Sequence, residues 1–174
     1  MRYYLTLFIA ILTLFSSKAE EYKDLSYSLG VEYGWDFNVP SYNPIGVKIA
    51  GLYNFNRHWG VGAETGITKY EKVILPVAAY GSYHFTQKKK FIPFIDVSIG
   101  YGISLAKESR GGFLMSVSMG TEYKLSDKIN LLLGLGYQTQ SLSRILKHSD
   151  EFALIEFREH LTHNTIGIKI GVVF

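Results

Sequence analysis

The sequence THNTIGIKIGVVF, at residues 162–174, alternates between two kinds of residue. One set of alternate positions carries aliphatic side chains and ends on Phe174, whereas the other set carries glycine and Lys169. Alternation with a period of two residues predicts a β-strand with one face in an apolar environment. Because an isolated strand of this kind would aggregate in water, we expect the rest of the chain to supply a closed sheet.

The same alternation recurs along the chain, which predicts eight strands. They span residues 25–37, 45–55, 59–68, 75–85, 91–105, 113–125, 129–138 and 162–174. The connections after the second, fourth and sixth strands are tight, and the others are longer, with 141–161 the longest. Short turns at one end and longer loops at the other are typical of an outer-membrane barrel. The predicted fold class is therefore all-β: an eight-stranded antiparallel up-and-down transmembrane β-barrel.

Residues 1–19 differ from the rest of the chain. Arg2 precedes an apolar run at 5–15, and Ser17 and Ala19 place small residues where a signal peptidase cleaves. The apolar run is shorter than the roughly 20 residues that a membrane-spanning helix needs. We predict a cleavable signal peptide at 1–19 and a barrel domain at 20–174. The alternative is a retained N-terminal anchor.

Composition argues against several kinds of function. The 174-residue chain has 18 basic and 15 acidic residues. Two of the basic residues lie in the predicted signal peptide, so the mature chain is close to neutral and gives no reason to expect a nucleic-acid partner. No cysteine is present, so packing and hydrogen-bonded closure must hold the exported chain together. We predict no cofactor and no metal site, because His160 and His163 lack a third ligand at a useful spacing.

Volume indicates which face of the strands points inward. Most of the 17 glycines lie on the polar face. The interior of an eight-stranded barrel is only wide enough for side chains to fill it, so the glycine-rich face fits there and the large apolar residues would overpack it. The apolar face is therefore expected to meet lipid, unlike that of a soluble lipocalin-like barrel.

Aromatic residues near both ends of the apolar face predict two girdles that bound an aliphatic band. The girdle near the tight turns contains Phe55, Trp59, Phe85, Phe91, Tyr123 and Phe174, and the other contains Tyr33, Trp35, Tyr101, Phe113 and Tyr137.

These features resemble the small OmpA/OmpX-type outer-membrane β-barrel family. The resemblance is carried by the signal peptide, eight amphipathic strands, the tight turns NRHW, TQKKK and SDK, and the terminal Phe174. It implies a monomer in the bacterial outer membrane, surrounded by lipid, with both termini in the periplasm. It also implies that the barrel-assembly machinery recognises the C-terminal strand through Phe174.

The polar face carries charges that we predict to form a structural network in the lumen. These residues are Glu32, Lys48, Glu64, Asp96, Glu122 and Lys169, with Tyr80, His84 and Gln138 beside them. Closure of the barrel should bring Lys169 near Glu32, and Lys48 stands one strand from Glu32 and Glu64. Charges in a narrow lumen are costly unless they are paired, so we expect ion pairs that plug the barrel. The alternative is a water-filled gap.

We predict a structural or surface-interaction role without catalysis. The alternatives are a lipid A-modifying barrel enzyme and a small gated pore. A deacylase of that kind carries His and Ser on the lipid-facing wall, but the predicted outward polar residues include neither. They are Thr65, Thr121, Thr139, Thr162 and Asn164.

The segment 141–161 is the predicted site for an extracellular partner. Ser149 or Asp150 could cap a short helix from Glu151, or the segment could extend the two flanking strands. Its apolar residues could bind a partner or pack over the barrel mouth.

Overall fold

The computed structural model of the chain describes the backbone of residues 25–39, 41–86, 90–106, 109–126, 128–150 and 153–174. It describes side chains over the same ranges, except for 144–150 and 153–159. The predicted signal peptide at 1–19 lies outside the described residues.

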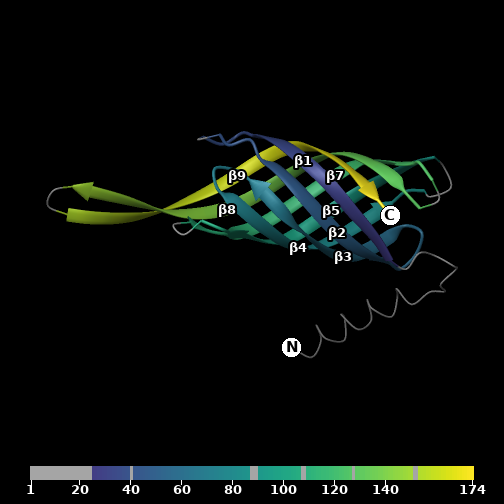
Figure 1. Cartoon of the computed structure of the whole chain (residues 1–174), viewed down its shortest axis with the longest axis horizontal. Coiled ribbons are helices and arrows are strands. Elements are labelled where there is room, and N and C mark those ends of the chain that lie inside the picture. The colour runs from purple at the N-terminus through teal and green to yellow at the C-terminus, as the bar shows by residue number, and fades with distance from the viewer. Residues whose placement is uncertain (1–24, 40, 87–89, 107–108, 127, 151–152) are drawn as a thin grey trace, which may run out of the picture.

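All the regular elements in these described ranges are antiparallel strands that close into a barrel (Figure 1). They are β1 (Leu25–Asp36), β2 (Ile45–Asn54), β3 (Trp59–Lys69), β4 (Val73–His84), β5 (Phe91–Ser104), β6 (Ser109–Arg110), β7 (Gly112–Lys124), β8 (Asn130–Asp150) and β9 (Ala153–Val173). Each long strand pairs with its neighbours in the chain, except that the short β6 pairs only with β8 beside the barrel mouth. Pairing of β9 with both β1 and β8 closes the sheet. The predicted eight-stranded barrel is confirmed, and β6 is an addition that the sequence pattern missed.

Strand β9, which ends the sequence, pairs with β1 along the seam that closes the barrel. Glu32 is the register partner of Lys169. At the tight-turn end of this seam, the backbone of Tyr27 exchanges two hydrogen bonds with that of Phe174, at 2.8 and 2.9 Å. The exposed Phe174 ring lies on the outside of the barrel, 6.2 Å from the Tyr27 ring. The C-terminal aromatic residue therefore has the outward position that the sequence predicts.

Strands β8 and β9 are 21 residues each, much longer than predicted. Their register continues from Gln140↔His163 to Asp150↔Ala153, beyond the last pairs that either strand makes with β7 or β1. The segment 141–161 therefore extends the two strands, and the alternative of a short helix is wrong. The resulting hairpin projects from the barrel at the end opposite the C-terminus (Figure 1). We call residues 141–162 the β8–β9 hairpin.

Burial alternates along the barrel strands as the sequence predicts. In β2, for example, Val47 and Ile49 are exposed on the outside, whereas Lys48 and Ala50 are buried in the lumen. Glycines on the inner face allow close packing there. A Cβ atom on Gly62 would lie 1.8 Å from the carbonyl oxygen of Gly51 on the next strand. The face assignment is therefore correct, with the apolar wall outside.

Two layers of buried apolar side chains cross the lumen. Near the hairpin end, Tyr70, Ile74 and Leu142 pack together. Toward the tight turns, the Phe94 ring occupies the space beside Gly120 and Gly134, where added Cβ atoms would lie 2.8 and 3.3 Å from it. The polar centre of the lumen therefore lies between two apolar layers.

Candidate functional site

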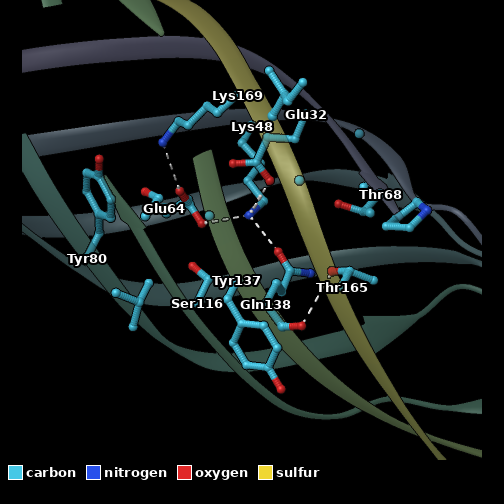
Figure 2. A pocket seen from close by; sticks show the side chains of 18 residues that line it. Glu32, Lys48, Glu64, Thr68, Tyr80, Ser116, Tyr137, Gln138, Thr165 and Lys169 are labelled. Carbon is cyan, nitrogen blue, oxygen red and sulfur yellow. Dashed lines mark hydrogen bonds and ion pairs between the residues drawn. The ribbon is translucent and has the colours of Figure 1, made fainter. Parts of the chain in front are cut away.

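The centre of the lumen is organised around Lys48 (Figure 2). Its Nζ atom lies 2.7 Å from Glu32 Oε2 and 3.4 Å from Glu64 Oε1, and it donates a 3.1 Å hydrogen bond to Gln138 Oε1. These residues come from β1, β2, β3 and β8, so the ammonium group links opposite sides of the barrel wall. The side chain of Lys48 is 4% exposed and that of Glu64 is 3% exposed.

Lys169 contacts different carboxylates from the one that the sequence predicts. Its Nζ atom lies 3.8 Å from Glu64 Oε2 and 3.9 Å from Asp96 Oδ2. Although its backbone lies opposite Glu32, the long side chain reaches across the lumen instead. The Tyr80 hydroxyl donates a 2.5 Å hydrogen bond to the same Asp96 oxygen. Five of the six predicted charges thus lie in one cluster. Closure of the barrel brings Lys169 opposite Glu32 in the register, as predicted, but the ion-pair contacts of its ammonium group are with Glu64 and Asp96.

Glu122 does not contact the central lysines. Its Oε1 atom lies 3.0 Å from His84 Nε2, and its Oε2 atom accepts a 2.8 Å hydrogen bond from Asn130. All three residues lie near the tight-turn end of the barrel, because β4 ends at His84 and β8 begins at Asn130. This predicted lumen carboxylate therefore lies in a separate group at the tight-turn end, where it contacts His84 and Asn130 and not the central lysines.

A third polar group near the hairpin end was not identified as a site from the sequence. Asp36 Oδ2 lies 2.6 Å from His163 Nδ1, and both side chains are almost completely buried. Asp36 also accepts hydrogen bonds from the backbone of Asn38 and Tyr42, which holds the connection after β1 in place. The sequence indicates only that both residues occupy alternate strand positions whose side chains face the lumen. Their pairing follows only from the β1–β9 register, which places Asp36 opposite Thr165.

Tyr70 connects the Asp36–His163 group with the central group around Lys48. Its hydroxyl accepts a 2.6 Å hydrogen bond from Gln138 Nε2, and its ring centroid lies 5.1 Å from that of His163. Burial raises the pKa of the Tyr70 hydroxyl above its usual range, so the group is neutral at physiological pH.

Little open space remains among these groups. A cavity of about 50 Å³ lies beside Lys48, Glu64, Thr68 and Gln138. A volume of this size holds only a few water molecules. Glu64 Oε1, which lies 3.4 Å from Lys48 Nζ, and Asp96 Oδ1 are buried and accept no hydrogen bond from the described residues.

Comparisons with known proteins agree on the architecture. No protein-family model matches the chain, and no curated protein matches its sequence. Neisserial surface protein A matches 88% of this chain and 98% of its own, with a TM-score of 0.62 and 12% identity. OprG from Pseudomonas aeruginosa matches 87% of this chain and 96% of its own, with a TM-score of 0.59 and 12% identity. The outer membrane protein AlkL matches 91% of this chain and 93% of its own, with a TM-score of 0.58 and 13% identity.

The fold is that of a small OmpA/OmpX-type outer-membrane β-barrel. At these levels of identity the likeness concerns the fold alone. Within the described ranges of this barrel, no group of three or more His, Asp or Glu side chains could hold a metal ion. No helix in the described part is long and apolar enough to cross a membrane.

The base of the β8–β9 hairpin holds one pair that the sequence analysis missed. Ser143 Oγ lies 2.8 Å from His160 Nδ1 across the β8–β9 ladder. Both positions have the outward parity of their strands. The sequence analysis did not include them among the outward polar residues, because its predicted strands covered only 129–138 and 162–174. Among the described side chains, His160 hydrogen-bonds only to Ser143.

Proposed function

We propose that the chain is an integral outer-membrane protein with a closed lumen, whose β8–β9 hairpin binds a partner at the cell surface. The observation that carries this proposal is the continuous ladder from Ser141↔Thr162 to Asp150↔Ala153. At about 3.3 Å per residue, ten residues of strand extend roughly 30 Å beyond the membrane-spanning wall. A mere connection between two strands would need only a few residues.

The composition of the hairpin supports a binding role. The register places Leu146 opposite Phe157 and, two residues further on, His148 opposite Ile155. Positions two residues apart share one face of a sheet, so beyond the charged pair Arg144↔Glu159 this face carries Leu146, Phe157 and Ile155. Among the described residues, neither strand has a second neighbour beyond the barrel except at β6, so these backbone edges are also available for pairing with another chain. Packing of this face against the barrel's own loops is the competing interpretation.

The closed lumen is supported by the contacts of Lys48 and Lys169, by the apolar layers above and below them, and by the small cavity. Buried charges in these contacts stabilise the barrel interior without catalysing a reaction. A gated pore would require these contacts to separate. In planar lipid bilayers the protein is expected to show no stable conductance step, and a reproducible open level would contradict the closed lumen.

The orientation follows from the two unlike ends of the barrel. We place the tight turns and both termini in the periplasm and the hairpin outside the cell, as a monomer with no unpaired sheet edge in the membrane. The hairpin contains Arg144, Lys147 and Arg158. Trypsin added to intact cells should therefore cut the protein into two fragments within the hairpin. Protection in intact cells, followed by cleavage after lysis, would reverse the orientation.

A shortened hairpin tests the binding role. Ser143 and His160 are register partners, so residues 144–159 can be replaced by Asn-Gly, which forms a two-residue turn between paired positions. The variant should fold, because β1 and β7 leave the ladder below this point. Cells that display the full protein should attach to one another or to a surface, and cells that display the shortened variant should not. If both proteins give the same attachment and aggregation, the hairpin has no binding role.

A second candidate function is ester hydrolysis, and only the Ser143–His160 hydrogen bond favours it. A Ser–His pair can form an activated nucleophile, although a third group normally orients the histidine. Refolded protein should leave lipid A unchanged in mass under the binding proposal. Loss of an acyl chain with the full protein, but not with Ser143→Ala, would favour the hydrolase.

A further inference from the structure

The outer wall of the barrel carries hydroxyl and amide groups on β8 and β9, toward the hairpin. The Tyr137 hydroxyl donates a 2.9 Å hydrogen bond to Asn164 Oδ1, and the Thr139 hydroxyl donates a 2.5 Å hydrogen bond to the same oxygen. Thr139 and Asn164 are register partners that face outward, since Gln140 and Thr165 beside them are buried in the lumen. We call Tyr137, Thr139 and Asn164 the polar stripe. Among the described residues, the Asn164 side-chain nitrogen has no hydrogen-bond partner, so it can donate to a molecule outside the chain.

Apolar side chains border the polar stripe on both neighbouring strands. Met115 on β7 is the register partner of Thr139 and is 41% exposed. On the other side, the Phe37 backbone nitrogen donates a 3.1 Å hydrogen bond to the Asn164 carbonyl oxygen, and Phe37 is 64% exposed. Exposed apolar residues on both sides are typical of a wall in contact with lipid. Polar groups at such a level are costly unless they find polar partners, so the stripe indicates contact with the polar part of a lipid.

A row with positive charge crosses the base of the hairpin beyond the polar stripe. Arg110 on β6 is the register partner of Ser143, which is also the register partner of His160. Register partners have their side chains on the same face of a sheet, and Ser143 and His160 have outward parity. Arg110 and His160 are exposed. Because Ser143 Oγ lies 2.8 Å from His160 Nδ1, Nε2 is the ring nitrogen that can contact a ligand. We call Arg110, Ser143 and His160 the basic row.

Three levels thus follow one another on the outward face of β8 and β9. Leu133 and Ile170 are exposed register partners in the aliphatic part of the wall. The polar stripe lies next toward the hairpin. The basic row lies four residues beyond Thr139 and Asn164, or about 13 Å along a strand. The order is therefore aliphatic, then hydroxyl and amide, then cationic.

This order distinguishes between two kinds of anionic amphiphile. In a phospholipid the phosphate is attached to the acylated glycerol, so the negative charge lies next to the acyl chains. In a phosphorylated glycolipid the sugar rings lie next to the acyl chains and carry the phosphate. Hydroxyl and amide side chains can exchange hydrogen bonds with sugar hydroxyls, and an arginine guanidinium matches a phosphate.

We propose that the polar stripe and the basic row together bind a phosphorylated glycolipid of the outer leaflet. Its acyl chains lie along the aliphatic wall, its sugar contacts the polar stripe, and its phosphate contacts Arg110 and His160. The choice of leaflet rests on the proposed orientation. The site does not depend on the binding role of the hairpin, because all six of its residues lie outside 144–159.

Native mass spectrometry of the full barrel in a neutral detergent tests the site. Lipid A, dephosphorylated lipid A with the same acyl chains, and phosphatidylglycerol are titrated in parallel. We expect lipid A to bind more tightly than either of the others. Arg110→Gln should weaken lipid A binding by about 5-fold and leave the dephosphorylated form unchanged. Lys69→Gln is the control, because Lys69 is an exposed cation at the same end of the barrel whose register partners Ile45 and Val73 are apolar.

A second pair of variants tests the polar stripe. Asn164→Leu should weaken both forms of lipid A by about 10-fold and leave phosphatidylglycerol unchanged. Thr121→Val, on the outward face of β7 near the tight turns, should bind like the wild type. Circular dichroism checks that each variant is folded, and Thr139→Val repeats the test if Asn164→Leu does not fold.

The site is wrong if the wild type binds lipid A and phosphatidylglycerol equally, or if either variant has the same effect as its control. The variant with the shortened hairpin keeps the whole site, so it should bind lipid A like the wild type even if cell attachment is lost. Loss of lipid A binding in that variant would overturn this location. Trypsin protection of the hairpin in intact cells would instead overturn the choice of leaflet.

Discussion

Replacing Lys48 by methionine should destabilise the barrel strongly. Methionine keeps most of the side-chain length but removes the charge that lies 2.7 Å from Glu32 and 3.4 Å from Glu64. Loss of one partner from a buried ion pair typically costs about 3–5 kcal/mol, because the other charge stays buried without compensation. Since Lys48 lines a small cavity that admits water, we expect the lower end of this range, about 3 kcal/mol.

Urea titration of the protein refolded into lipid vesicles measures this free energy of unfolding. The matched control is Lys69→Met on the adjacent β3, where the lysine is exposed and its replacement should cost about 0–1 kcal/mol. Glu64→Gln in the Lys48→Met background should recover part of the loss, because it removes the uncompensated charge. Equal and small effects at Lys48 and Lys69 would show that the lumen charges are solvated, and the closed lumen would be refuted.

Three further changes follow from the same structure. Lys169→Met should cost less than Lys48→Met in the same titration, because its two ion-pair distances are 3.8 and 3.9 Å; an equal or larger cost would contradict the ranking. Deletion of Phe174 removes two backbone hydrogen bonds at the seam and should lower the folded protein recovered from membranes, and unchanged recovery would argue against this role. Gly62→Ala should destabilise by about 1–3 kcal/mol through overpacking. Gly81→Ala, whose Cβ would lie 3.9 Å from its nearest neighbour, should be nearly neutral, and equal losses would show that packing is not the cause.

The alternation of apolar and polar residues determined most of the barrel. It located the eight long strands and the face that each one buries, because side chains on a strand change sides at every residue. The glycine-rich face could line only a narrow lumen, so the volume argument gave the correct side. In β2, where Val47 is exposed and Lys48 buried, the parity prediction agrees with the structure residue by residue.

The ends of the strands at the barrel mouth could not be predicted in the same way. Residues 141–161 contain apolar and charged residues that suit either a short helix or two strands. The cross-strand ladder between β8 and β9 decides between them, because backbone pairing with a distant segment supplies the missing stabilisation. The same ladder brings Ser143 and His160 together, which no pattern within either segment indicates.

The alternation of side chains along a strand also does not determine which charged residues form ion pairs in the lumen. It places a residue inside the barrel but fixes neither its height nor the reach of its side chain. Lys169 is opposite Glu32 in the backbone, yet its ammonium group lies near Glu64 and Asp96 on strands across the lumen. The sequence thus determined which residues face the lumen, whereas strand register and the length of each side chain, which exist only in the closed barrel, decided the ion pairs.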